Sequence, residues 1–302
     1  MMQRVLVTGA RGFVGRSIVK ELLKQNAEVL ALDRTKADFN DAKVICEQFD
    51  LLNNEELFRI IDLYRPTSVI HLAAIASPVY GNVAELYNIN IHGSENLLDV
   101  LADVCPRGTR VVLTSTAGVY GNASKEFIDE QTPYNPQNHY SFSKMVMEYI
   151  AKFYDSLDIK IIRPFNMIGG GQNENFLVPK LVQAYVKKQD VLSVGNMQTY
   201  RDFTDVGFAA QIFCKAALCK EMKEKVLNIC SGKGTCGNDI LNILEQITGY
   251  KPKIEVNPQF LRKNEIMRLV GDPAKCNGFI GNNIVSLSVR EILEEMVRFY
   301  SD

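Results

Sequence analysis

A tyrosine and a lysine four residues apart, Tyr140 and Lys144, have the clearest potential for chemistry in this sequence. On a helix, side chains at this spacing share one face. An isolated tyrosine titrates near pH ~10, but a neighbouring cation favours the phenolate and lowers its pKa. We therefore expect Lys144 to lower the pKa of Tyr140 and the pair to act in proton transfer. The spacing alone is common, because on a surface helix such a pair is usually just solvated.

The start of the chain indicates what this pair acts beside. An apolar run, residues 4–8, ends in three glycines spaced G-x-x-G-x-x-G, and an amphipathic pattern begins at once. In such a turn from strand to helix, Gly9 permits the tight turn, Gly12 lets a phosphate approach, and Gly15 lets helix and strand pack. The motif predicts a dinucleotide site, with a glycine-rich turn that binds no ligand as the alternative.

Asp33 ends the second predicted strand, about 20 residues after the glycines, where a carboxylate accepts hydrogen bonds from both ribose hydroxyls of adenosine. This position favours NAD(H) over NADP(H), because a carboxylate repels a 2′-phosphate. Arg34 follows directly and is able to partner a phosphate, so NADP(H) stays open. Asp50 is expected near the adenine amino group, and the small side chains of Ala73 and Ala74 leave room for the dinucleotide.

Strands and helices are predicted to alternate through the first half of the chain, which indicates an α/β fold with a doubly wound parallel Rossmann sheet. Ligands then bind beyond the carboxyl ends of the strands. We expect a dinucleotide-binding domain of residues 1–163 plus about 204–231, and a smaller, discontinuous substrate lobe of about 164–203 plus 232–302. The predicted strands are 4–8, 28–33, 44–50, 68–73, 110–115, 160–163 and 226–229, with a strand pair in 191–203; the predicted helices are 12–26, 54–64, 83–104, 138–156, 176–188, 206–220, 238–248 and 288–300.

Composition excludes several classes of function. The 302 residues carry a formal charge of -1, which indicates no nucleic-acid or membrane-surface partner. No charged-then-apolar leader or membrane-spanning run is predicted. The seven cysteines form no C-x-x-C pair, which is typical of reduced thiols in a cytoplasm. The three histidines are far apart, so we expect no metal site.

Thr116 ends the predicted strand that precedes the Tyr140 helix, and its hydroxyl is expected to reach the same substrate oxygen. With the glycine turn and the acid in this order, the chain resembles the extended short-chain dehydrogenase/reductase family over nearly its whole length. The resemblance lies in residues 8–15, 71–74, 88–98, 113–121, 140–144 and 163–166. It implies a tightly bound nicotinamide cofactor, most often a nucleotide-sugar substrate, and a supporting role for Asn90, which is otherwise a polar contact inside a helix. The predicted cofactor site comprises Gly9, Arg11, Gly12, Phe13, Val14, Asp33, Arg34, Asp50, Leu51, Ala73, Ala74, Asn90, Thr114, Tyr140, Lys144 and Pro164.

The two residues after Thr116 distinguish members of this family. The 4,6-dehydratases that the chain otherwise resembles have acids here, which remove water from the sugar. Ala117 and Gly118 hold no proton-transfer group, so this sequence lacks the acid and base that a dehydratase needs. Of the reactions in this family, hydride transfer at a carbinol or a ketone is therefore the one that we expect.

Segments 163–172, 175–182, 200–206 and 261–275 resemble the GDP-sugar branch of the family. The resemblance implies that Arg201 and Arg262 hold the nucleotide diphosphate, for which guanidinium groups are suited. It also places Asn166 and Lys180 at the diphosphate or the sugar. Lys263 departs from the branch, which usually has proline there. Ordinary surface ion pairing is the alternative for both arginines.

We therefore predict a cytoplasmic NAD(P)-dependent oxidoreductase that reduces the C4 ketone of a GDP-4-keto-6-deoxyhexose, or oxidises C4 of a GDP-sugar. An NDP-sugar 4-epimerase and a non-catalytic NAD(H)-binding protein are the alternatives. The resemblance also implies a homodimer, in which residues 83–104 and 138–156 pair in a four-helix bundle. Its apolar candidates, which are equally suited to an intramolecular core, are Leu97, Leu98, Leu101, Met145, Val146 and Tyr149.

Overall fold

The computed structural model describes residues 3–35, 38–77, 80–260 and 265–301. The chain divides into two compact units. The first contains residues 1–120, 134–164 and 210–227, and the second contains 121–133, 165–209 and 228–302. Residues 121–133, which we assigned to the first domain, are grouped with the second unit, where Ile128 forms a β-bridge with Gly271.

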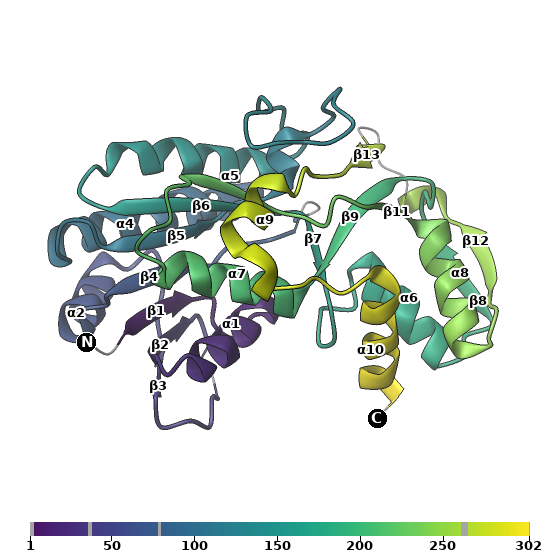
Figure 1. The fold of residues 1–302 in the computed structure, drawn as a ribbon, viewed down its shortest axis with the longest axis horizontal. Coiled ribbons are helices and arrows are strands. Elements are labelled where there is room, and N and C mark those ends of the chain that lie inside the picture. Colours follow the sequence, from purple (N-terminus) through teal and green to yellow (C-terminus); the bar gives the residue numbers. More distant parts are fainter. Residues whose placement is uncertain (1–2, 36–37, 78–79, 261–264, 302) are drawn as a thin grey trace. The chain divides into compact units, whose positions relative to one another are not determined.

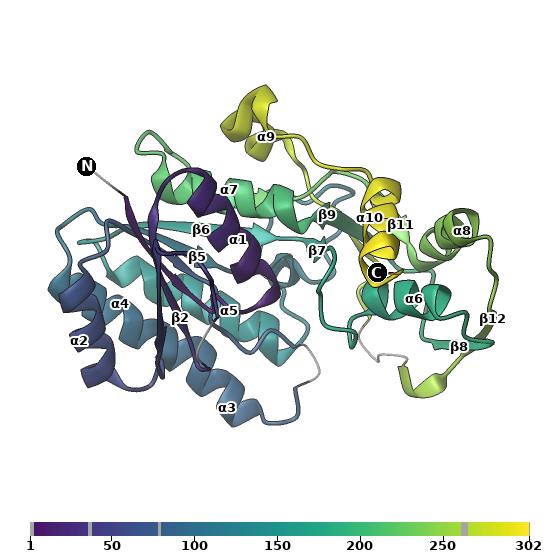
Figure 2. The same cartoon turned by 90° about the horizontal axis from the view of Figure 1, so that it is seen from below.

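The first unit is built on a seven-stranded sheet with the order β10-β6-β5-β4-β1-β2-β3. Each strand pair with a described register is parallel, which confirms the predicted Rossmann fold. Figures 1 and 2 show α1 and α7 on one face of this sheet and α2, α4 and α5 on the other. The strands are β1 (Arg4–Thr8), β2 (Glu28–Asp33), β3 (Val44–Gln48), β4 (Ser68–His71), β5 (Arg110–Thr114), β6 (Asp158–Pro164) and β10 (Val226–Ile229).

The helices are α1 (Phe13–Lys24), α2 (Asn54–Tyr64), α3 (Val83–Tyr87), α4 (Gly93–Val104), α5 (His139–Ile150) and α7 (Val206–Leu218). The long helix that we expected over residues 83–104 is interrupted by a π-helical turn, Asn88–His92. Such turns insert an extra residue into a helix and are frequent at functional sites. The helix expected over 138–156 ends at Ile150 and is followed by a 3₁₀ turn, Ala151–Phe153.

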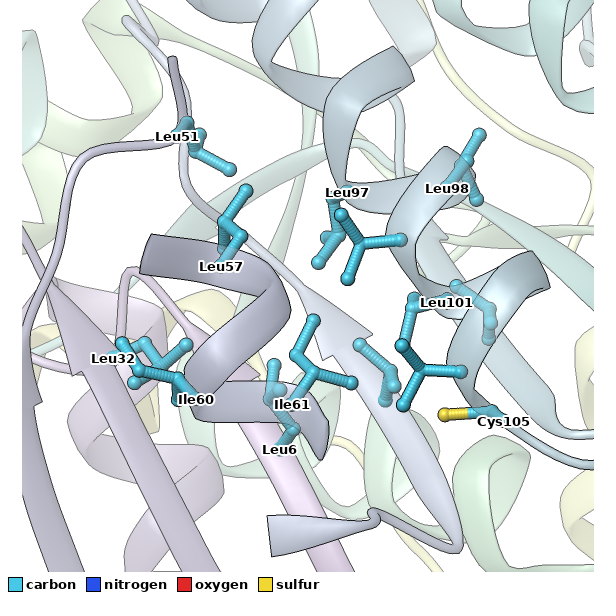
Figure 3. Close-up of a cluster of buried hydrophobic side chains, with 14 of the residues drawn as sticks. Leu6, Leu32, Leu51, Leu57, Ile60, Ile61, Leu97, Leu98, Leu101 and Cys105 are labelled. Atoms are coloured by element: carbon cyan, nitrogen blue, oxygen red, sulfur yellow. The ribbon is translucent and has the colours of Figure 1, made fainter. Parts of the chain in front are cut away.

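A cluster of buried side chains from β1, β2, α2, α4 and β5 forms the core on one face of this sheet (Figure 3). Leu57 and Ile61 of α2 face Leu97 and Leu101 of α4, and all four are completely buried. The strands are buried on both faces because helices cover both, which explains their near-continuous apolar sequences. This packing fixes the carboxyl ends of the strands, where the predicted site residues lie.

The second unit contains three strands in the order β11-β9-β13, with β7 also paired to β9, and a separate parallel pair, β12-β8. The expected pairing within residues 191–203 is wrong, because β8 pairs with β12 and β9 with β7, β11 and β13. Residues 166–168, where no strand was predicted, form β7. The elements are β7 (Asn166–Ile168), α6 (Leu177–Val186), β8 (Val191–Val194), β9 (Tyr200–Asp205), β11 (Gly234–Cys236), α8 (Gly237–Thr248), β12 (Lys253–Val256), β13 (Arg268–Leu269), α9 (Ala274–Ile280) and α10 (Val289–Ser301).

Helices α6, α8 and α10 contribute to a second core together with β8 and β9. Asp202 of β9 is completely buried, and its carboxylate accepts hydrogen bonds from the backbone N–H groups of Ser231, Gly232 and Gly271. These bonds fix the segments that flank β9. Burial raises the pKa of Asp202, and its hydrogen bonds act in the opposite direction.

Candidate active site

The glycine turn between β1 and α1 has the geometry of a phosphate cradle. Gly9 has φ 69°, and a Cβ there would lie 2.8 Å from the backbone N of Ala73. A Cβ on Gly15 would lie 2.3 Å from the carbonyl oxygen of Gly9, so that glycine lets α1 pack on the turn. Gly12 is exposed, and its added Cβ would meet only the Gly9 oxygen, at 3.2 Å. The turn therefore offers bare backbone beside a helix N-terminus, which suits a diphosphate.

Asp33 lies at the carboxyl end of β2, beside this turn. Its carboxylate accepts a 3.0 Å hydrogen bond from the backbone N of Arg11, which fixes it next to the glycines. Arg34 is exposed, with its guanidinium 3.9 Å from the carboxylate of Glu85. The Nη1 of Arg11 donates to the hydroxyl of Thr35. A ribose acceptor and two exposed guanidinium groups therefore lie at one end of the turn.

The other predicted cofactor residues follow the strand ends. Phe13 and Val14 begin α1, Ala73 and Ala74 follow β4, and Pro164 ends β6. Thr114 ends β5, and its hydroxyl is buried with no hydrogen-bond partner among the described residues. A buried orphan hydroxyl is costly, so its position is consistent with a ligand group that accepts or donates there. Together with the glycine turn and Asp33, it makes the residues present a good fit for NAD.

The side chains of Asp50 and Leu51 are less well placed for a cofactor than those of the other predicted cofactor residues. Asp50 is exposed beyond β3, and its carboxylate accepts a hydrogen bond from the backbone N of Leu52. The side chain of Leu51 is buried in the core and lies against Gly93. Only the backbone of Leu51 is left for a cofactor.

Thr116, Tyr140 and Lys144 are brought together within the first unit. The Thr116 hydroxyl is near enough to the phenol of Tyr140 to lower its pKa. Lys144, one helical turn further along α5, is completely buried. Asn138 caps this helix by accepting a 2.8 Å hydrogen bond from the backbone N of Ser141, so Tyr140 lies in its first turn.

The pKa values of this pair depend mainly on burial. Burial raises the pKa of Tyr140 to about 12, while the hydrogen bond with Thr116 lowers it. This direction is opposite to the lowering that we expected from Lys144. Burial lowers the pKa of Lys144 to about 8, and the carboxylate of Glu148 raises it. At neutral pH the phenol is therefore protonated, and Lys144 is largely charged.

A buried polar network supports the catalytic helix. Asn90, in the π turn, accepts a 2.8 Å hydrogen bond from the backbone N of Ile75 and donates one of 3.0 Å to Oγ of Ser143. Ser94 donates to the carbonyl of Asn90 and is hydrogen-bonded to Nε2 of His71 at 3.0 Å. Asn90 thus connects two parts of the site: the segment that follows β4, and helix α5. This arrangement agrees with a role in supporting the catalytic helix.

Apart from Thr116, the described residues that were predicted to bind substrate, Asn166, Lys180 and Arg201, lie in the second unit. The amide of Asn166, on β7, donates to the carbonyl of Asp202, and Arg201 lies on β9, the strand that pairs with β7. Nη1 of Arg201 donates to the carbonyl of Tyr200. Lys180, on α6, donates to the carbonyl of Ser193, and its ammonium lies 4.6 Å from the centre of the Phe260 ring. Arg262 lies outside the described residues, so its role stays a prediction.

Glu148 and Arg163 were missed as functional candidates. Both are buried, and the guanidinium of Arg163 binds the carboxylate of Glu148. The signal in the sequence is the spacing, because Glu148 follows Lys144 by four residues on the same helix face.

The fold and this arrangement define a nucleotide-binding oxidoreductase of the Rossmann type. The chain belongs to the NAD dependent epimerase/dehydratase family, which it matches over residues 5–230.

Individual relatives match over nearly the whole chain. The chain is 35% identical to GDP-6-deoxy-D-talose 4-dehydrogenase of Aggregatibacter actinomycetemcomitans, with 98% of this chain and 97% of the relative covered. It is 27% identical to GDP-6-deoxy-D-mannose reductase of Pseudomonas aeruginosa, with the same coverage of 98% and 97%. Among solved structures, UDP-glucose 4-epimerase of Thermus thermophilus in complex with NAD is 26% identical, covers 99% of each chain and has a TM-score of 0.86.

The described residues contain neither a helix suited to cross a membrane nor a cluster of metal ligands. Within residues 3–35, 38–77, 80–260 and 265–301, no helix combines the length and apolar character required to span a bilayer. Across the same ranges, no group of three or more His, Cys, Asp or Glu side chains is arranged to hold a metal ion. All seven cysteines are free thiols.

Proposed function

We propose that this protein transfers hydride between NAD(H) and C4 of a GDP-linked 6-deoxyhexose, reducing the 4-ketone or oxidising the 4-hydroxyl. The observation that supports this most directly is that the Thr116 hydroxyl acts on the phenol of Tyr140, with buried Lys144 one helical turn away. The names of the two GDP-sugar relatives support the substrate class. Ala117 and Gly118 support oxidoreduction over dehydration, because neither is able to exchange a proton.

Each member of the triad has one task in this scheme. When bound, the nicotinamide supplies or accepts the hydride. Tyr140 gives its phenolic proton to the C4 oxygen during reduction and takes it back during oxidation. Its pKa of about 12 keeps the proton available for donation at neutral pH. Thr116 binds the same oxygen, and the ammonium of Lys144 holds the nicotinamide ribose. Because charge develops on that oxygen during the reaction, these donors stabilise mainly the transition state.

The substrate's diphosphate is assigned to the second unit. We propose that Arg201 and Arg262 bind the phosphates, and that Asn166 and Lys180 contact the phosphates or the sugar. Within that unit Lys180 already has two partners, Ser193 and Phe260. Lys180 therefore has to exchange one of them to reach a phosphate.

NAD(H) is the favoured cofactor, and NADP(H) remains an alternative because Arg11 and Arg34 are both exposed near Asp33. We also propose a homodimer formed by the outer faces of α4 and α5. Leu97, Leu98 and Leu101 belong to the intramolecular core. A dimer must instead use exposed apolar residues such as Phe142, Tyr149 and Phe153. A cytoplasmic location stays a prediction from the sequence.

The decisive experiment mixes the protein with GDP-4-keto-6-deoxymannose and NADH and follows the absorbance of the reduced nicotinamide. A reductase oxidises one NADH for each sugar reduced. The reverse assay supplies NAD⁺ with a GDP-6-deoxyhexose and follows NADH formation. Interconversion of C4 epimers with no net change in NADH would establish the epimerase alternative. Tight NADH binding with no turnover of any 4-keto sugar would favour the non-catalytic alternative.

A further inference from the structure

Glu148 is a carboxylate that the scheme above does not use, and it has no exposed surface. Its Oε1 accepts a hydrogen bond of 3.0 Å from Nε of Arg163, and it also accepts one from the hydroxyl of Ser115. Its Oε2 accepts one of 2.9 Å from the phenol of Tyr134, and Nη2 of Arg163 binds the same oxygen. Both oxygens of the carboxylate are therefore occupied by donors from other parts of the chain.

Stability alone is a poor explanation for this ion pair. Both side chains are almost completely removed from water, and the cost of desolvating two charges often equals or exceeds their attraction. Buried pairs of this kind are frequently replaced by apolar side chains without loss of stability. A role in the site is the more informative interpretation, because Ser115 and Arg163 each adjoin a predicted site residue and Glu148 lies one helical turn from Lys144.

The sequence neighbours of these residues define that role. Ser115 directly precedes Thr116 at the end of β5, and Arg163 directly precedes Pro164 at the end of β6. Glu148 lies on α5 one turn after Lys144. One carboxylate thus ties the carboxyl ends of two neighbouring strands to the helix that holds Tyr140 and Lys144.

Glu148 is also an anion one helical turn from Lys144, and its charge acts on the ammonium. Among the described residues, the titratable groups that interact electrostatically with Lys144 are Glu148 on α5 and His71 on β4. Burial lowers the pKa of His71 to about 3, so His71 is neutral at physiological pH. Arg163, on β6, is the nearby cation, and its charge is paired with Glu148. Glu148 is the only one of these groups that favours the ammonium, and it opposes the effect of burial on Lys144.

We propose that Glu148 is a positioning residue for the proton-transfer group: its carboxylate, held by Arg163, fixes α5 against the Thr116 end of β5 and keeps Lys144 cationic. The inference rests on the proposed function only in assigning Lys144 to the bound cofactor. It is tested by NADH binding, which does not require a sugar substrate. Failure of GDP-sugar turnover would therefore leave this test unaffected.

The experiment measures NADH affinity by fluorescence titration across a pH series, with wild type and Glu148→Gln. In wild type, affinity is expected to fall as the pH rises through the pKa of Lys144, about 8, since the neutral amine is a weaker donor. In Glu148→Gln, the fall is expected about one pH unit lower, because the neighbouring anion is gone. Glu95→Gln, the same change at an exposed acid of α4, is the matched control and should keep the wild-type profile.

Glu148→Gln leaves the buried charge of Arg163 without its carboxylate, which is able to unfold the protein. The double variant Glu148→Met, Arg163→Met removes both charges and both desolvation costs, and it provides a second test. A folded variant of either kind with the wild-type pH profile of NADH binding would overturn the proposal. Failure of both variants to fold would also overturn it, because the ion pair would then serve the fold itself.

Discussion

The side-chain amide of Asn90 donates a hydrogen bond of 3.0 Å to Oγ of Ser143, a residue that lies between Tyr140 and Lys144 on α5. The same hydroxyl donates to the carbonyl of Tyr140 at 2.7 Å. The π turn is therefore coupled to the first turn of the catalytic helix. Asn90 is completely buried, so no solvent replaces these bonds when they are lost.

The first prediction concerns this coupling. Asn90→Ala should lower the free energy of unfolding by about 1–3 kcal/mol, because it leaves the backbone groups of Ile75 without their partners. It should also lower kcat, since α5 loses one of its anchors. Ser143→Ala removes the Asn90–α5 connection and the bond from the same hydroxyl to the Tyr140 carbonyl, and it should lower kcat with a smaller loss of stability. Chemical denaturation and steady-state kinetics measure both. Wild-type kcat in both variants would contradict the coupling.

The second prediction concerns the proton donor. Tyr140→Phe removes the phenolic hydroxyl and keeps the ring, so NADH affinity should be retained while turnover falls by about 10²–10⁴-fold. Tyr149→Phe removes the hydroxyl of an exposed tyrosine on the same helix and should leave turnover unchanged. Fluorescence titration and hydride-transfer assays measure the two quantities. An unimpaired Tyr140→Phe enzyme would exclude Tyr140 as the proton donor.

The third prediction concerns cofactor choice. Asp33→Ala should weaken NADH binding by about 10- to 100-fold, the effect of losing hydrogen bonds to a carboxylate. NADPH binding should weaken less, because the same change removes repulsion of the 2′-phosphate. Asp41→Ala, at an exposed acid before β3, should change neither affinity. An equal loss for both cofactors would argue against a ribose contact by Asp33.

The fourth prediction concerns acid stability. His71 is buried between the hydroxyls of Thr8 and Ser94, and burial lowers its pKa to about 3 from the ordinary 6.5. Between pH 6.5 and about 3, His71 is protonated in the unfolded chain and neutral in the folded protein. The contribution of His71 to stability is therefore complete above the unfolded pKa and is lost as the pH falls, by about 1.4 kcal/mol per pH unit.

Denaturation at several pH values below neutrality measures this slope. His71→Gln, which carries no charge at any pH, should reduce the loss of stability on acidification. His92→Gln, at an exposed histidine of the π turn, should retain the wild-type slope. An identical acid dependence in wild type and His71→Gln would show that other groups cause it.

The fifth prediction concerns self-association. Phe153, directly after α5, is 82% exposed, and Leu63 on α2 is 81% exposed. If the outer face of α5 forms the dimer interface, Phe153→Asp should give a monomer, because a charge cannot be buried there without a partner. Leu63→Asp, an equally exposed change elsewhere, should leave a dimer. Light scattering with size-exclusion chromatography distinguishes the two. A dimer in both variants would exclude this interface.

The parts of the site that follow one another along the chain were predictable from the sequence. The glycine turn, Asp33 and the Tyr140–Lys144 pair are all local patterns, and the parallel sheet follows from alternating buried strands and helices. The π turn was not predictable, because apolar periodicity over residues 83–104 continues through it. The pairing of β8 with β9 was likewise predicted from local sequence alone. Short strands near in sequence are expected to pair, yet here each finds distant partners.

The polar network around Glu148 was missed because its members come from distant segments. Taken one at a time in the sequence, Ser115, Tyr134 and Arg163 show no functional pattern. Only the fold brings these three residues to the carboxylate of Glu148. The direction of the Tyr140 pKa was missed for a related reason. The spacing shows that a cation is near, but it does not show how deeply the phenol is buried, and burial is the larger effect.

The packing around Gly118 limits how this protein is able to change. A Cβ at that position would lie 2.4 Å from Oγ of Ser141 and 3.3 Å from Oγ1 of Thr116. The neighbouring Ala117 is buried. A dehydratase's acid at position 118 would therefore displace the Ser141 side chain of the helix that carries Tyr140. Conversion to water elimination thus couples the loop after Thr116 to the first turn of α5.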